Sequence, residues 1–506
     1  MMENNISTES VRVFSADYFV SNDTRKTGLN NNDLILGPSG AGKTGGYVIP
    51  NIMQAQESIV IADTKRNLSR KLGYALRQKG FDIYTIDLVN PEKSTPYNPL
   101  EYISIDERTG NLREQDIMTI SNAIMDFSTP DDPFWEYSSK GVVACLVSYV
   151  KEAYPKDKQN LGSVVEVYKQ LSAAVGSSTR RVGDSNVPVV PFLEEWTEKH
   201  PDSFAGKKYM MFRSVLAAER TWGCIAQYVS SALNIFDFRE ARRLFCENSD
   251  FLLQDLGRRK IALFLNISDT DRTFDKINNL FYTQVIQALC READKNPDSR
   301  LAVPVRIIMD DFATNTRVPD FDKIISVIRS REISVSLILQ NLTQLNTMYQ
   351  DAAAATIVSN CDHILYLGGN DLNTARYISC FADVPVQRIL CMPLDKAYII
   401  ERGKKAQLCD KIRPYSIEIP VGDTEEDVMT LDKWGEFEEF IDKEFDFGDD
   451  SSDDAFEDPL DDDDISVDDV IDDDLLTFSD DSNDDDDPLF DPDNLDSLFD
   501  DDGVPF

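Results

Sequence analysis

Eight residues early in the chain have the types and spacing of a phosphate-binding loop. Residues 37–44 read GPSGAGKT, which fits the pattern GxxxxGK[ST]. The glycines of such a loop let backbone N–H groups and a helix N-terminus face phosphates, while the lysine neutralises the β and γ oxygens and the threonine holds magnesium. A glycine-rich turn before an ordinary helix is the alternative. The expected nucleotide-binding residues are Gly37, Pro38, Ser39, Gly40, Ala41, Gly42, Lys43, Thr44 and Gly45.

Two adjacent carboxylates follow a later apolar run and would complete a site for magnesium and ATP. Residues 305–309, VRIIM, precede Asp310 and Asp311. We expect Asp310 to support magnesium through water, at the metal that Thr44 also holds, and Asp311 to polarise the attacking water. An aspartate pair that only caps the end of a strand is the alternative.

Three further polar residues are candidates for catalysis. Gln340 follows the apolar run 333–339 and is placed like a sensor of the γ-phosphate, although a structural amide fits its position as well. Arg329 and Arg331 come shortly before that run, and either one could reach a neighbouring subunit's nucleotide site. A surface salt bridge is the alternative for both arginines.

These side chains require strands that end at one edge of a sheet, and the apolar runs supply them. The runs alternate with helix-like segments such as 67–79, which favours βαβ units and an α/β fold built on a mostly parallel sheet. The expected strands are 33–36, 58–63, 82–87, 260–266, 305–309, 333–339 and 363–367.

Between the third and fourth runs the strand signals fade. Segments 122–127, 138–154 and 209–236 have apolar residues at three- and four-residue spacing, which predicts an inserted all-α domain. The expected organisation is a polar N-terminal lead (1–30), a nucleotide-binding domain in two parts (31–104 and 251–420), the all-α domain (105–250) and an acidic tail (421–506).

The charge of the chain is unevenly distributed. The 506 residues carry a formal net charge of −39, from 51 basic and 90 acidic residues. Residues 444–506 contain 29 of the acidic residues and no lysine or arginine, so residues 1–443 carry only −10. Self-repulsion and sparse apolar content predict that the tail is disordered. The acidic average therefore does not exclude a nucleic-acid partner for the rest of the chain.

Histidine and cysteine usage narrows the chemistry. His200 and His363 are the two histidines, which makes a histidine-based triad or metal site a poor hypothesis. The eight cysteines form no CxxC pair, and with no signal peptide they predict reduced thiols of a cytosolic protein. No apolar run approaches the roughly 18 residues that span a bilayer, so we expect a soluble chain. Scattered basic pairs, such as Arg180–Arg181 and Lys207–Lys208, do not identify a DNA surface by themselves.

Several segments together resemble the type IV coupling proteins, the VirD/TraG-like ATPases of conjugation and type IV secretion. The first is GPSGAGKTGGYVIPN at residues 37–51. The others are residues 97–100 (YNPL), 132–136 (DPFWE), 268–274 (SDTDRTF), 319–333 (PDFDKIISVIRSREI) and 360–371 (NCDHILYLGGND). The resemblance covers about residues 33–400, and the ordered set is far more specific than any one motif.

The resemblance implies a RecA-like domain that carries an all-α domain and assembles as a homo-hexameric ring. In the family, the ring recruits relaxase-bound, single-stranded DNA and drives it to a secretion channel with Mg²⁺ and ATP. Lys43 and Thr44 match the family's Walker A pair, Asp310 its Walker B acid, Arg329 its arginine finger and Gln340 its sensor. The expected function is therefore a P-loop ATPase that couples hydrolysis to DNA transfer.

The sequence departs from the family pattern in three places. Asp311 stands where most members have glutamate, and residues 63–67 read DTKRN instead of the more usual DPKGE. Members of the family normally begin with transmembrane helices, whereas only some thirty polar residues precede the loop here. We therefore expect a separate membrane-anchor protein to hold this ATPase at the cytoplasmic face of the membrane, or the chain to belong to a soluble branch.

Two other functions remain open. One is a DNA translocase of the FtsK/HerA type, and the other is an ATP-binding adaptor that docks substrates without motor activity. The acidic tail fits capture of a basic relaxase or accessory protein, with a merely solubilising tail as the alternative. Its spaced apolar pairs are Leu475–Leu476, Leu489–Phe490 and Leu498–Phe499, followed by the terminal Val504–Pro505–Phe506.

Overall fold

A computed structural model describes residues 10–125, 133–182, 185–249, 251–268, 270–312, 317–414 and 419–420. The acidic tail, including its apolar pairs, lies outside the described residues, as does Asp132 of the segment 132–136. Within the described part of the chain, no helix is long and apolar enough to cross a membrane.

The centre of the fold is a nine-stranded sheet in the order β13-β12-β11-β3-β10-β9-β4-β8-β5. The seven strands from β11 to β5 are parallel, and β12 and β13 add an antiparallel edge. The strands are β3 (Asp33–Leu36), β4 (Ser58–Asp63), β5 (Asp82–Asp87), β8 (Ile261–Asn266), β9 (Val305–Met309), β10 (Ile333–Leu339), β11 (His363–Tyr366), β12 (Lys396–Glu401) and β13 (Gln407–Asp410).

The predicted strands are confirmed, most of them with the expected bounds. Every residue of β3, β4, β8, β9, β10 and β11 is buried, as expected for short apolar runs covered on both faces. Sequence analysis predicted neither β12 nor β13. The second of these alternates little and is mostly exposed, so it carries no strong pattern.

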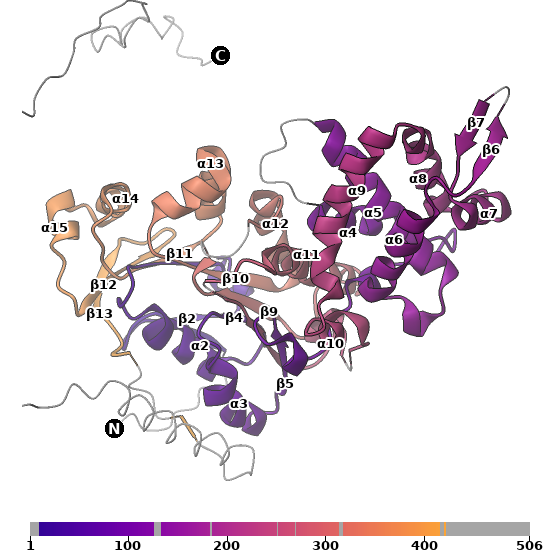
Figure 1. Cartoon of the computed structure of the whole chain (residues 1–506). Helices are drawn as coiled ribbons and strands as arrows, with labels where there is room; N and C mark the ends of the chain where they lie inside the picture. Colours follow the sequence, from indigo (N-terminus) through magenta and orange to yellow (C-terminus); the bar gives the residue numbers. More distant parts are fainter. Residues whose placement is uncertain are drawn as a thin grey trace, which may run out of the picture. The chain divides into compact units, whose positions relative to one another are not determined.

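Helices cover both faces of the sheet (Figure 1). Helices α2 (Ile49–Gln54) and α3 (Leu68–Gln78) pack on one face, against side chains such as Ile35 and Phe264. On the other face lie α11 (Asp275–Ala293), α12 (Phe321–Val327), α13 (Leu342–Ser359) and α14 (Leu372–Ala382), followed by the short α15 (Val386–Leu390). This is the layered α/β fold that the sequence predicted.

The segment between β5 and β8 is mostly helical. Its helices are α4 (Glu114–Ile124), α5 (Pro133–Ala153), α6 (Leu161–Ala174), α7 (Pro191–Lys199), α8 (Phe204–Phe212), α9 (Glu219–Leu233) and α10 (Arg242–Cys246). A hairpin of β6 (Thr179–Val182) and β7 (Ser185–Pro188), which was not predicted, interrupts them. The α5 helix is the centre of this segment, and α4 also packs against α11 of the sheet region.

The polar start of the chain also folds. Strands β1 (Val11–Val13) and β2 (Phe19–Ser21) form a hairpin, and α1 (Thr24–Thr27) follows it. Phe14 and Val20 of this region are buried in the same apolar cluster as α2 and α3. The N-terminal segment is therefore part of the layer that covers the face of the sheet on which α2 and α3 pack.

Candidate nucleotide-binding site

The glycine-rich loop leaves the sheet at the carboxyl end of β3. The N–H of Gly37 donates to the carbonyl of Leu339, the last residue of the neighbouring β10, at 3.1 Å. Gly40 and Gly42 have φ values of +77° and +94°, which side chains rarely adopt, so glycine is needed at both turns. A helical stretch starts directly afterwards, with a π-helical turn over Thr44–Val48 that continues into α2.

Lys43 lies inside the curl of the loop. Its Nζ donates to the carbonyl oxygens of Gly37, at 2.8 Å, and of Pro38, at 3.0 Å. Burial lowers the pKa of Lys43, and the nearby carboxylates of Asp311 and Asp310 oppose that effect. The ammonium group is thus held where the loop would bring phosphate oxygens.

Thr44 and Asp310 meet across the gap between the loop and β9. The Thr44 hydroxyl donates to Asp310 Oδ2 at 2.7 Å. Burial raises the pKa of Asp310 to about 6, Asp311 adds to the rise, and the hydrogen bond from Thr44 opposes it. A hydroxyl and a buried carboxylate are hard oxygen ligands that suit Mg²⁺, so these residues fit the expected metal.

Asp311 sits beside this pair in an unusual backbone conformation. Its φ is +48°, in the left-handed region, and its N–H donates to Asp310 Oδ1 at 3.0 Å. A non-glycine residue in this region is uncommon, although aspartate tolerates it better than most, and such residues cluster at functional sites. The turn places a second, half-buried carboxylate directly after the first.

The unusual segment 63–67 caps a helix. Asp63, the last residue of β4, accepts from the N–H of Leu68 at the start of α3, at 2.7 Å. Burial raises the pKa of Asp63, and the backbone N–H groups of residues 65–68 oppose that shift. Asp63 lines a small cavity with Thr44 and Asp310, so the departure from the family pattern lies next to the expected metal ligands.

Gln340 is close to the loop, as expected, with an exposed side chain. Gln340 comes directly after Leu339, whose carbonyl accepts a hydrogen bond from the Gly37 N–H. It also lines a small cavity together with Pro38. The side chain of Gln344 accepts from the Gln340 N–H at 3.0 Å.

Arg329 and Arg331 lie at the other end of β10. Arg329 is exposed and donates to the carbonyl of Gly28 at 3.1 Å, while Arg331 pairs with Asp294 at 3.0 Å. Both precede the first residue of β10, whereas the loop lies beyond its last residue. The structure therefore does not bring either arginine to the nucleotide loop of the same chain.

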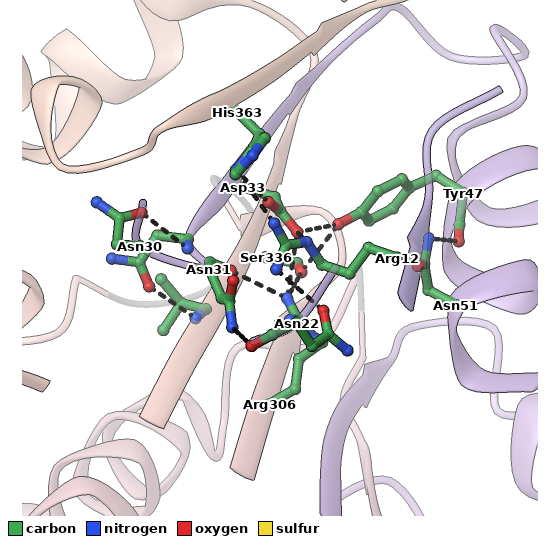
Figure 2. Close-up of polar contacts among 12 residues, drawn as sticks. Arg12, Asn22, Asn30, Asn31, Asp33, Tyr47, Asn51, Arg306, Ser336 and His363 are labelled. Carbon is green, nitrogen blue, oxygen red and sulfur yellow. Dashed lines mark hydrogen bonds and ion pairs between the residues drawn. The ribbon is translucent and has the colours of Figure 1, made fainter. Parts of the chain in front are cut away.

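A group of buried charged residues at the amino ends of β3 and β9 was not predicted from the sequence (Figure 2). Asp33 and Arg306 stand near the starts of β3 and β9, and Arg12 comes from the N-terminal hairpin. All three are nearly inaccessible to solvent. A charged residue at the start of an otherwise apolar strand was the only signal in the sequence for such a network. A charged residue that merely marks the boundary of a strand gives the same pattern, so the signal could not be interpreted.

Comparisons with known proteins agree with this geometry. The model of the family described as "Type IV secretory system Conjugative DNA transfer" matches residues 2–381. Protein VirD4 of Rhizobium radiobacter is 21% identical over 348 residues, which are 68% of this chain and 47% of that protein. Protein VirD4 of Agrobacterium fabrum is 22% identical over 352 residues, which are 68% of this chain and 48% of that protein. The chain spans about half the length of these relatives.

Solved structures share the fold. The unbound form of the bacterial conjugative coupling protein TrwBdeltaN70 has a TM-score of 0.56 at 12% identity, covering 82% of this chain and 91% of that chain. The plasmid coupling protein TrwB in complex with ADP and Mg²⁺ has a TM-score of 0.54 at 13% identity, covering 78% and 87%. The family match spans most of the chain, and the fold agrees with it. The chain therefore belongs to the family of type IV secretory system conjugative DNA transfer proteins.

Proposed function

We propose that this protein is a conjugative coupling ATPase, which binds Mg²⁺ and ATP and uses hydrolysis to drive DNA toward a type IV secretion channel. The observation that carries the proposal is the contact of the Thr44 hydroxyl with the buried Asp310 carboxylate, beside Lys43 in the glycine-rich loop. The solved structures of TrwB with ADP and Mg²⁺ and with a non-hydrolysable ATP analogue support the choice of ligand.

Each residue of the site has a distinct task in this proposal. The loop N–H groups and Lys43 bind the phosphates, and Thr44 and Asp310 hold the metal, which neutralises charge on the phosphate oxygens. Asp311 accepts a proton from the attacking water, and Gln340 orients that water or the γ-phosphate. A carboxylate one methylene shorter than glutamate reaches less far, so we expect a slow intrinsic rate that DNA stimulates.

The test is steady-state ATP hydrolysis by the full chain, with and without single-stranded DNA. Lys43→Ala and Asp310→Ala should each reduce turnover by about 100-fold or more, because each removes charge stabilisation of the transition state. Lys323→Ala is the matched control, since Lys323 is exposed and pairs with Asp320, three residues earlier on the same helix start. Wild-type turnover in the Lys43 variant would contradict the proposal.

Partners follow from the proposed function. We propose a homo-hexamer as the active form, relaxase-linked single-stranded DNA as the cargo, and a separate membrane protein that holds the ring at the cytoplasmic face. The acidic tail, which lies outside the described residues, is proposed to capture a basic relaxase or accessory protein. Truncation after residue 443 should then abolish that capture in a pull-down at low salt while leaving ATP hydrolysis intact. Undiminished capture would leave the tail with a solubilising role.

A further inference from the structure

A buried network of charges lies at the amino ends of the strands whose carboxyl ends form the nucleotide site (Figure 2). Asp33 is the first residue of β3, four positions before Gly37 of the loop. Arg306 is the second residue of β9, four positions before Asp310. Strand β10 lies between these two strands and pairs with both. The network therefore links the amino ends of β3 and β9. The carboxyl end of β3 leads to Lys43 and Thr44, and that of β9 leads to Asp310.

Asp33 is the centre of this network and is fully buried. Its Oδ2 accepts from the hydroxyl of Tyr47 at 2.7 Å and from Arg306 Nη1 at 3.1 Å. Arg12 Nε lies 3.1 Å from the same oxygen. Arg306 Nε also donates to Glu57 at 3.2 Å, so two arginines face two carboxylates. The charges balance, but all four groups have been removed from water.

His363, which lies beside Arg12, is neutral and therefore leaves this charge balance unchanged. Burial lowers the pKa of His363 to about 4, so its ring is neutral at physiological pH. Arg12 Nη2 lies 3.2 Å from His363 Nδ1, and since arginine can only donate, Nδ1 accepts and the proton is on Nε2. Arg12 also donates to Asn22 of the N-terminal hairpin at 3.0 Å. Arg12, itself a residue of the hairpin, thus attaches it to β11 through His363 and to β3, the strand that carries the loop, through Asp33.

Tyr47 connects the network to the phosphate-binding helix. It stands three residues after Thr44, on the π-helical turn, and its ring is buried. Its hydroxyl also lies 3.1 Å from Ser336 Oγ of β10. Two residues of the same helical turn therefore bind opposite ends of the sheet's strands. Thr44 binds Asp310 just beyond the carboxyl end of β9, and Tyr47 binds Asp33 at the amino end of β3.

Stability alone is a poor explanation for this arrangement. Buried ion pairs generally contribute no more than apolar residues of the same shape, because desolvation offsets their attraction. What such a network supplies is a fixed position for each partner. A π-helical turn, which is also uncommon, is frequently found at functional sites.

We propose that Tyr47 is a positioning residue of the ATPase site, which acts through Asp33 to fix the Thr44 hydroxyl relative to Asp310. This inference rests on the proposed function for its catalytic consequence. Without the Tyr47 hydroxyl, the start of the helix keeps its packing but loses its hydrogen bond to Asp33 at the amino end of β3. Thr44 and Asp310 then spend less time in the geometry that holds magnesium.

The experiment is Tyr47→Phe in the full chain, which removes only the hydroxyl. We expect the Mg²⁺ concentration for half-maximal binding of a fluorescent ATP analogue to rise roughly 10-fold, the lower end of the effect of removing a direct partner of a metal ligand, because Tyr47 acts one contact further away. We expect turnover to fall by a similar factor, measured at a temperature at which melting curves show both variants fully folded, because Asp33 loses a hydrogen bond in Tyr47→Phe and the variant is less stable than the control. The control is Tyr282→Phe, because Tyr282 is equally buried and its hydroxyl has no hydrogen-bond partner among the described residues.

Three results would overturn the inference: an unchanged Mg²⁺ midpoint in Tyr47→Phe, an equal shift in Tyr282→Phe, or full activity of Tyr47→Phe at saturating and limiting Mg²⁺ alike. If Tyr47→Phe fails to fold, Ser336→Ala replaces it, since that change removes the second partner of the same hydroxyl. Its midpoint should shift in the same direction by a smaller factor. A wild-type chain without any hydrolysis would contradict the proposed function instead, while the Mg²⁺ midpoint of nucleotide binding would still judge Tyr47.

Discussion

At the scale of single residues, the site depends on groups whose protonation is set by burial. Asp310 and His363 illustrate opposite cases, because burial raises the pKa of the acid to about 6 and lowers that of the imidazole to about 4. Both shifts favour the neutral form. In the proposed site Asp310 holds the metal as a carboxylate, whereas His363 accepts from Arg12 as a neutral ring. Near pH 7 the Asp310 carboxyl is mostly ionised and the His363 ring is neutral.

His363 makes a testable contribution to the pH dependence of stability. Its folded pKa of about 4 lies below the ordinary value of 6.5, so the unfolded chain binds the proton more tightly. The free energy of unfolding that this ring contributes is therefore complete near pH 7 and is lost as the pH falls from about 6.5 toward 4. Between pH 7 and pH 5 the loss should be about 2 kcal/mol.

Urea unfolding of His363→Gln at pH 7 and pH 5 checks this value. The variant should lose about 2 kcal/mol less between the two pH values than the wild type does, because glutamine does not titrate. His200→Gln is the control, since His200 is exposed, packs against the Trp196 ring and lies outside the network. A variant with the same pH dependence as the wild type would show that the His363 ring is not held neutral.

At the scale of elements, the strands could be predicted and the network between them could not. Apolar runs of four to seven residues bounded by polar ones identify buried strands, and β3, β9 and β10 were found with correct bounds. The order of the strands in the sheet cannot be predicted from the residues of any one apolar run. Only the pairing of β10 with both β3 and β9 brings Asp33 close to Arg306, which is 273 residues away.

The same reasoning explains which parts of the site were found. Lys43, Thr44 and Asp310 belong to motifs in which spacing alone indicates the chemistry. They were predicted to support magnesium and phosphate, and the structure brings Thr44 and Asp310 into a hydrogen bond that was not predicted. The N-terminal hairpin has three-residue strands in a polar segment, too short for periodicity to be seen. Its place is decided by long-range contacts instead. Arg12 reaches Asp33, and Asn51 reaches Val13.

Asn51 gives a prediction for this hairpin. Its side chain accepts from the N–H of Val13 at 2.9 Å and donates to the carbonyls of Val13 and Tyr47, both at 2.8 Å. Asn51→Ala removes all three of these buried hydrogen bonds, so it should destabilise the protein by about 2–4 kcal/mol. Hydrogen exchange at Val13 should accelerate more than exchange in β10. Equal acceleration in both strands would mean that the hairpin does not open separately.

At the scale of the whole molecule, the catalytic candidates lie at opposite ends of the parallel strands of one sheet. The nucleotide loop follows the carboxyl end of β3, and Arg329 precedes the amino end of the adjacent β10. A strand of seven residues is roughly 20 Å long, so Arg329 is too far from the loop of its own chain to contact a bound phosphate. If Arg329 contributes to hydrolysis, it must do so in the site of a neighbouring copy.

Mixed assemblies test this requirement. Arg329→Ala and Lys43→Ala chains should each be inactive alone, because the first lacks the arginine in every interface and the second lacks a working loop. After subunits of the two variants are mixed equally, an interface is complete when an Arg329→Ala chain supplies the loop and a Lys43→Ala chain supplies the arginine. Random assembly makes about a quarter of the interfaces complete, so about a quarter of wild-type ATP hydrolysis should return. Arg331→Ala in place of Arg329→Ala is the matched control, since Arg331 pairs with Asp294 and should be active without mixing. No recovery in the mixture, or full activity of Arg329→Ala alone, would exclude Arg329 as a residue shared between subunits.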